Sequence, residues 1–157
     1  MIRRCLTTLL LMFVVTSSAS LGGQEPSTTT VSVTITDPRD GTEVGRQIVV
    51  KGTAKVPESQ KVWLVIRRVD FDPFWWVVAM IRPKSGTGQF EVKGTVGEAA
   101  DVGSDFDVGV ITVDETSHRT LLDHFTKTVE EGKFTPIRIP ATTSPPRIIK
   151  VRKVSHR

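Results

Sequence analysis

The stretch Lys61-Val-Trp-Leu-Val-Ile-Arg-Arg-Val-Asp-Phe-Asp-Pro-Phe-Trp-Trp-Val-Val-Ala-Met-Ile81 decides the fold, because it holds all three tryptophans and the densest apolar content after residue 20. Apolar residues occupy both alternating faces of Val62–Arg67 and of Phe74–Ile81. β-Branched and aromatic residues favour strands, and a strand that is apolar on both faces is usually covered on each side. Pro73 cannot donate a ladder hydrogen bond, so it belongs at a strand start. The stretch predicts two neighbouring strands at the centre of a β core.

The first 20 residues have the three parts of a secretory signal, with a basic start at Arg3 and Arg4, the apolar run Leu9–Val15 and small residues before a cleavage point. This run is too short to cross a bilayer, which takes about 20 residues, although an uncleaved anchor is the alternative. We predict a signal peptide over 1–20 and a flexible Gly, Ser, Thr and Pro linker over 21–29. The folded chain is then exported, either to the periplasm or out of the cell.

The only cysteine, Cys5, lies within the predicted signal, so the mature chain cannot form a disulfide. Loss of Arg3 and Arg4 with the signal lowers the formal net charge from +4 to +2. Acids and bases are interspersed, which disfavours a nucleic-acid-binding module. The basic run Arg147–Arg157 alternates with Ile and Val, and we interpret it as an edge strand protected by Lys and Arg; a polyanion site is the alternative.

Strands and turns alternate about every 10 to 15 residues over much of the chain, which is typical of a β-sandwich. The expected strands are Val31–Thr36, Gln47–Ala54, Val62–Arg67, Phe74–Ile81, Phe90–Val96, Phe106–Val113 and Ile148–Val154.

One segment departs from this pattern before the last strand. Leu121, Leu122, Phe125 and Val129 have helical spacing. Ser117 or Thr120 is a candidate start, Gly132 a candidate end, and Glu130 and Glu131 oppose the helix dipole. We expect one short, frayed helix.

The segment Ile35-Thr-Asp-Pro-Arg-Asp-Gly-Thr-Glu-Val44 followed by Ile48-Val-Val-Lys-Gly-Thr-Ala54 resembles the start of bacterial immunoglobulin-like domains of exported proteins. Val62–Arg67 and Gly88–Val92 are similar to later strands of those domains. The resemblance covers about Val31–Val113 and implies an all-β, Greek-key β-sandwich of about seven strands. It places an immunoglobulin-like domain at residues 30–154, with a tail at 155–157, and implies adhesion, spacing or ligand contact as its role.

The chain departs from antibody domains in two respects. It lacks a core disulfide, and it has no tyrosine for the corner found in those domains. The helical segment also has no place in a minimal sandwich, so the resemblance leaves the strand order beyond Val113 open.

No catalytic constellation stands out, and we predict that the chain is not an enzyme and needs no cofactor. No Gly-x-Ser-x-Gly motif is present, and His118, His124 and His156 are the only candidate bases. We expect these histidines to be solvated. A hydrolase whose site escapes notice is a third hypothesis for the function.

Several carboxylates cluster along one expected strand and its two ends, and we expect them to be solvated, with Ca²⁺ binding as the alternative. They are Asp101, Asp105, Asp107, Asp114 and Glu115. The EF-hand spacing is missing, so we predict no metal site.

The candidate binding residues are Trp63, Arg67, Phe74, Trp75 and Trp76. Trp75 and Trp76 are consecutive in a strand, so they point to opposite faces and only one can lie deep in a single sandwich core. An exposed tryptophan beside arginine suits a protein partner or a sugar ring. The alternative is that the helical segment covers it.

The function predicted from the sequence is therefore that of an exported, non-enzymatic immunoglobulin-like module that acts by protein–protein or surface contact at the cell envelope. The alternative is a carbohydrate-binding protein with an exposed tryptophan platform. Neither hypothesis calls for nucleic acid, or for a stable membrane span after signal cleavage.

Overall fold

The computed structural model describes residues 30–157, so the predicted signal peptide (1–20) and linker (21–29) lie outside the described residues. The strands are β1 (Ser32–Asp37), β2 (Thr42–Val44), β3 (Gln47–Lys55), β4 (Lys61–Arg68), β5 (Phe74–Ile81), β6 (Gln89–Thr95), β7 (Asp105–Val113), β8 (Ile137–Arg138) and β9 (Arg147–Lys153). The helices are the 3-10 helices η1 (Val69–Phe71) and η2 (Ala99–Asp101) and the α-helix α1 (Glu115–Glu131). Seven of these strands have six or more residues, which confirms the expected number.

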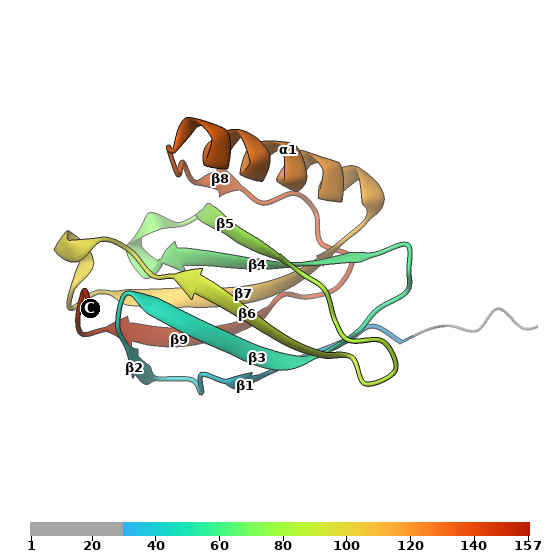
Figure 1. Cartoon of the computed structure of the whole chain (residues 1–157), viewed down its shortest axis with the longest axis horizontal. Coiled ribbons are helices and arrows are strands. Elements are labelled where there is room, and N and C mark those ends of the chain that lie inside the picture. The colour runs from blue at the N-terminus through green and yellow to red at the C-terminus, as the bar shows by residue number, and fades with distance from the viewer. Residues whose placement is uncertain (1–29) are drawn as a thin grey trace, which may run out of the picture.

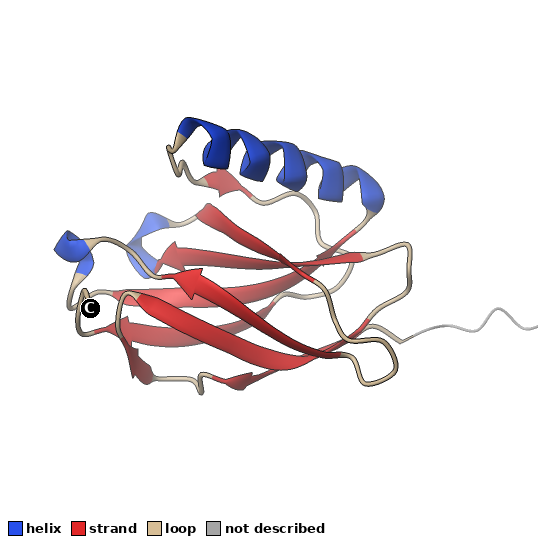
Figure 2. Cartoon of the chain, in the orientation of Figure 1, coloured by secondary structure: helices blue, strands red, loops and turns tan. Residues whose placement is uncertain are grey.

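The strands form two sheets; the two short 3-10 helices lie at one end of them, and α1 lies over a face of the larger sheet (Figure 2). The smaller sheet has the order β1-β3-β6, and the larger has the order β2-β9-β7-β4-β5-β8. The order β9-β7-β4-β5 corresponds to strands G, F, C and C′ of an immunoglobulin sandwich, and β1-β3-β6 to strands A, B and E. The predicted all-β immunoglobulin-like sandwich with one helix before the last strand is confirmed, and the two-residue β8 also lies between that helix and β9. Strand D, which lies beside E in such sandwiches, has no counterpart within residues 30–157.

The larger sheet is covered on both faces, so the molecule has two hydrophobic cores. Figure 1 shows α1 above β4 and β5, with β3 and β1 of the smaller sheet on the opposite side. The first core lies between the sheets and is formed by Val50, Leu64, Ile66, Phe90, Phe106, Val108 and their neighbours. The second lies under α1 and is formed by Trp63, Val65, Trp75, Val77, Ile111, Val113 and Leu121. This three-layer arrangement explains the strands that are apolar on both faces.

The stretch Lys61–Ile81 takes the central position predicted for it. β4 pairs antiparallel with β5 on one side and with β7 on the other. Each side chain from Val62 to Ile66 is at most 2% exposed. A helix that packs on the outer face is what allows Trp63 and Val65 to be as buried as Leu64.

Helix α1 is longer and better capped than expected. It begins after Asp114, whose carboxylate accepts a hydrogen bond from Ser117 N–H at 2.8 Å, so the predicted caps Ser117 and Thr120 are wrong. It ends at Gly132, as predicted, in the left-handed conformation with φ of 65°. The unfavourable charge of Glu131 near the helix end is offset by Lys127, whose ammonium lies 3.9 Å from it. No helix within residues 30–157 is both long enough and apolar enough to cross a membrane.

The basic C-terminal strand is not an edge strand, contrary to prediction. β9 pairs with β7 on one side, and β2 covers the other side in parallel register. Lys153, at the end of β9, has no exposed surface. The alternation of charged and apolar residues is the same for an edge strand and for a strand that a short segment covers, which is why the sequence did not distinguish them.

Candidate functional site

Trp75 and Trp76 lie on opposite faces of β5, as their adjacency in a strand predicts. Trp75 belongs to the core beneath α1, whereas Trp76 lies on the side of the larger sheet that faces the smaller one. Trp75 is 6% exposed, and Trp76 is half-buried. The two residues therefore have different roles.

Trp63 is fully buried beneath α1 and has no surface that a ligand could contact. Its indole Nε1 donates a hydrogen bond to Nδ1 of His118 at 3.2 Å, and its ring packs edge-on against Phe125 at 6.1 Å. His118 is 9% exposed, so the expectation of a solvated histidine is wrong for this residue. The reason is that a buried indole N–H needs an acceptor, and His118 on the first turns of α1 supplies it.

Trp75 is covered by the chain itself, as the alternative interpretation held. The guanidinium of Arg67 lies 4.5 Å from the centre of its ring. Arg67 also binds Asp107 at 2.9 Å and forms an ion pair with Asp72. Arg67 is therefore engaged within the fold. Phe74 is 38% exposed, with the Arg138 guanidinium 5.5 Å from its ring.

Trp76 forms an aromatic cluster with Phe71 of η1 and with Phe134 from the loop after α1. Its ring stacks on Phe71 with centroids 5.4 Å apart and an interplanar angle of 29°. Its Nε1 donates a hydrogen bond to the carbonyl oxygen of Phe134 at 3.1 Å. Phe71 is 40% exposed and Phe134 is 62% exposed. Phe71, Trp76 and Phe134 therefore lie together at the surface, the first two through ring stacking and Phe134 through its carbonyl oxygen.

This cluster borders a pocket of about 630 Å³, here called the Trp76 pocket, where the margins of the two sheets diverge between β5 and β6. Its apolar lining is Ile66, Phe71, Trp76, Val77, Val78, Phe106 and Phe134, and its charged lining is Arg46, Arg68, Lys93, Glu98 and Asp101. The volume lies within the range of about 300–1,000 Å³ that is typical of ligand pockets. Of the predicted site residues, Trp76 alone lines it.

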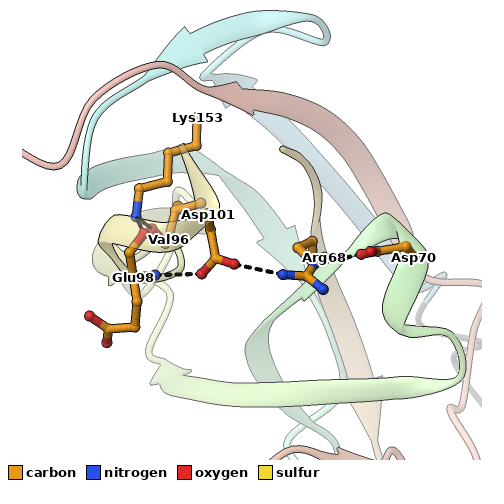
Figure 3. A network of polar contacts seen from close by, with 6 residues as sticks. All are labelled: Arg68, Asp70, Val96, Glu98, Asp101 and Lys153. Carbon is orange, nitrogen blue, oxygen red and sulfur yellow. Dashed lines mark hydrogen bonds and ion pairs between the residues drawn. The ribbon is translucent and has the colours of Figure 1, made fainter. Parts of the chain in front are cut away.

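A charged network forms one wall of the Trp76 pocket (Figure 3). Arg68 donates to Asp70 at 2.6 Å and to Asp101 at 2.7 Å, and Asp101 also accepts from Glu98 N–H at 2.6 Å. Burial acts to raise the pKa of Asp101, but the hydrogen bond from Glu98 and the ion pair with Arg68 outweigh it and hold the pKa below its ordinary value. Asp101 therefore stays ionised and fixes the orientation of the Arg68 guanidinium.

Lys153 anchors the loop that carries Asp101. Its ammonium donates to the carbonyl oxygens of Val96 at 2.7 Å and Glu98 at 2.6 Å (Figure 3). Burial lowers the pKa of Lys153, and the negative charge of Asp101 opposes this shift. A basic residue of the predicted edge strand thus holds one wall of the Trp76 pocket in place.

The carboxylates considered for Ca²⁺ are separated by their own partners. Asp101 binds Arg68, Asp107 binds Arg67, and Asp105 lies 3.6 Å from Arg152. Asp114 caps α1. Within the part of the chain that the structure describes, no group of three or more His, Cys, Asp or Glu residues is placed to hold a metal ion.

The other residues of the Trp76 pocket had no distinctive signal in the sequence. Phe134 follows the glycine that ends α1, and Arg46 and Lys93 belong to different strands or turns of the smaller sheet. These residues line one pocket only because their segments come together at the end of the sandwich where β5 and β6 separate.

No protein-family model matches the chain, and no curated protein sequence matches it. Among solved structures, the chain is similar to murine CRIg at 4% identity, with 82% of this chain and 99% of that chain covered and a TM-score of 0.33. The fold assignment rests on the strand order described above.

Proposed function

We propose that the chain is an exported, non-enzymatic contact module and that the Trp76 pocket receives a side chain of a protein partner. The observation that supports the proposal is the aromatic cluster of Phe71, Trp76 and Phe134 beside an open pocket. Tryptophan and arginine are enriched among the residues that dominate binding energy at interfaces. Here Trp76 is the tryptophan that the fold leaves accessible, and Arg68 is held beside it by Asp101.

Export is part of this proposal and depends on the signal-like residues 1–20 and on a mature chain without cysteine. A sandwich without disulfides depends mainly on burial for its stability, and the two cores provide that burial. The partner is then a protein of the cell envelope or of its surroundings.

Site-specific photo-crosslinking tests the contact site. A photoreactive phenylalanine analogue replaces Phe134 in one variant and Leu122 in a matched control, because both side chains are large, apolar and exposed. We expect a discrete crosslinked protein from position 134 in envelope extracts, reduced by Trp76→Ala, and none from position 122. Equal products from both positions, or none from position 134, would contradict the proposal.

Carbohydrate binding is the second candidate, because Trp76 is only half-buried where it lines the pocket and the pocket wall contains several polar side chains. Sugar rings bind by stacking on an indole face while their hydroxyls accept and donate hydrogen bonds. Glycan-array binding that is lost in Trp76→Ala and retained in Leu122→Ala would favour this candidate over a protein partner.

A further inference from the structure

The sheet edges of the described chain differ in how they are protected. In the larger sheet, the edges are the three-residue β2 and the two-residue β8. Because β8 pairs only with Phe74 and Trp75, the rest of β5 is also an edge, and it has a register shift opposite Leu64 and Val65.

In the smaller sheet, β1 has a register shift between Ile35 and Asp37 and is followed by Pro38. β6 is seven residues long, has no proline and keeps regular register with β3. Short strands, bulges and prolines protect edges from pairing, and β6 has none of these three; its charged residues Glu91 and Lys93 instead restrict which strand can pair with it.

The backbone of β6 presents a row of hydrogen-bonding groups away from β3. Just beyond the two ends of β6, Val96 N–H donates to the carbonyl oxygen of Arg46, and Ala54 N–H donates to the carbonyl oxygen of Gly88. Hydrogen-bonded pairs recur at every second residue of an antiparallel ladder, so the even-numbered residues of β6 bond to β3. The odd-numbered residues face outward. Lys84 N–H binds the carbonyl oxygen of Gln89, which leaves the N–H and C=O groups of Glu91, Lys93 and Thr95 without a backbone partner within residues 30–157.

The space beside this edge is part of the Trp76 pocket, which has both apolar and charged lining residues. It is the place that strand D takes in a complete immunoglobulin sandwich, and Lys93, Gly94 and Thr95 of β6 line the Trp76 pocket. The side chains of a strand added here would alternate as those of β6 do, with one set pointing toward solvent and the other toward the pocket.

Charge indicates what kind of strand fits. Glu91 is paired with Lys51 at 3.5 Å, whereas Lys93 lies opposite Val49 and has no ion pair in the described part of the chain. Lys93 is the middle of the three free residues, so a second copy of β6 paired symmetrically would place Lys93 against itself. Like charges that face each other across strands are destabilising, which disfavours self-pairing and favours an acidic residue at that position.

We propose that the free edge of β6 binds an extended segment of the protein partner as a fourth strand of the β1-β3-β6 sheet. Polar and apolar residues alternate along this segment, with an acidic residue beside Lys93 and the neighbouring apolar residue in the Trp76 pocket. Main-chain hydrogen bonds supply affinity in this mode, and alternate side chains supply specificity. The inference rests on the proposed contact function and specifies the class of its partner.

The test uses the exported chain and a fluorescent seven-residue peptide, Thr-Val-Glu-Leu-Glu-Val-Thr, with binding followed by anisotropy. In a strand, alternate N–H groups point to opposite edges. One further peptide is therefore N-methylated at its odd-numbered residues and another at its even-numbered residues. Because only one set faces β6, we expect one methylated peptide to lose about tenfold or more in affinity and the other to keep it. Lys93→Glu should weaken binding about as strongly, whereas Lys150→Glu, the same charge change at an exposed position of β9, should not.

Three results would overturn the inference. The first is no binding of the unmethylated peptide. The second is equal binding of both methylated peptides; if that binding is lost in Trp76→Ala, the contact function stands without edge pairing. The third is a concentration-dependent dimer that Lys93→Glu alters, which would assign the edge to a second copy. Absence of a crosslink from position 134 would instead contradict the contact function itself.

Discussion

The two faces of the larger sheet carry similar aromatic residues but are completed differently. On one face, α1 lies over Trp63 and Trp75, which are 0% and 6% exposed. On the other, the three-stranded sheet ends at β6 and leaves Trp76 beside an open pocket. Helix α1 covers the first face, which is here called the closed face. The smaller sheet covers most of the second face but not its margin beside β6, and this second face is here called the open face.

The difference shows what distinguishes a structural tryptophan from an accessible one in this chain. The indole of Trp63 binds a buried histidine on the covering helix, whereas that of Trp76 binds a backbone carbonyl in an exposed loop. Both are satisfied, so hydrogen bonding does not separate them. The two tryptophans differ because α1, a later part of the chain, packs over the face of the sheet that carries Trp63, whereas no element covers Trp76 at the pocket.

Truncating the closed face should have the largest effect. Trp63→Ala leaves a cavity and removes the donor to His118, and we expect a loss of about 3–5 kcal/mol in the free energy of unfolding, measured by chemical denaturation. The same truncation on the open face, Trp76→Ala, should cost about 1–2 kcal/mol. Similar losses for both variants would mean that the two faces are equally closed.

The covering helix offers a matched pair of leucines. Leu121 is fully buried and Leu122 is 40% exposed. We expect Leu121→Ala to cost about 2–5 kcal/mol and Leu122→Ala to change stability by about 0.5 kcal/mol or less. Thermal and denaturant unfolding of the two variants check this, and an equal cost would mean that α1 is rotated relative to the sheet.

The wall of the open face should be sensitive to acid. The folded-state pKa of Asp101 is below its ordinary value of 3.8, so the unfolded chain binds more protons in this range. The stabilisation from Asp101 is complete above that ordinary value and is lost as the pH falls through the folded-state pKa. Asp101→Asn should cost about 1–3 kcal/mol at neutral pH and show a shallower loss of stability in acid. Parallel acid profiles for the variant and the parent would contradict the assigned ion pair with Arg68.

Fluorescence quenching should give the smallest but most direct signal. We expect acrylamide to quench only part of the tryptophan emission. Trp76→Phe should remove the quenchable part, and Trp75→Phe should leave it. If the emission of Trp75 proves as accessible as that of Trp76, the assignment of closed and open faces is wrong.

Local patterns were sufficient to predict most of the fold. Alternation and β-branched content placed β4 and β5 at the centre, and helical spacing with Gly132 located α1. The same spacing includes Leu122 and Val129, yet they are 40% and 54% exposed. A stripe of apolar residues indicates a helix, but the packing angle selects which of them reach the sheet.

The candidate site was predictable only in part. Trp76 was one of five candidate residues, and no local feature favoured it over Trp75, since both are strand tryptophans with the same neighbours. Phe71 joins Trp76 from the neighbouring η1, whereas Phe134 comes from a loop 58 residues farther along the chain and Lys93 from the other sheet. Sequence patterns report periodicity within one element, whereas a pocket depends on where several elements end.

The sequence by itself determined that this chain forms β layers around aliphatic and indole side chains, because strand periodicity and turn residues are local properties. Only the tertiary structure decided which tryptophan is accessible, that Lys153 is buried, and that the edge of β6 is free. Those outcomes depend on contacts between residues far apart in the chain, such as α1 with β4 and Lys153 with Val96 and Glu98.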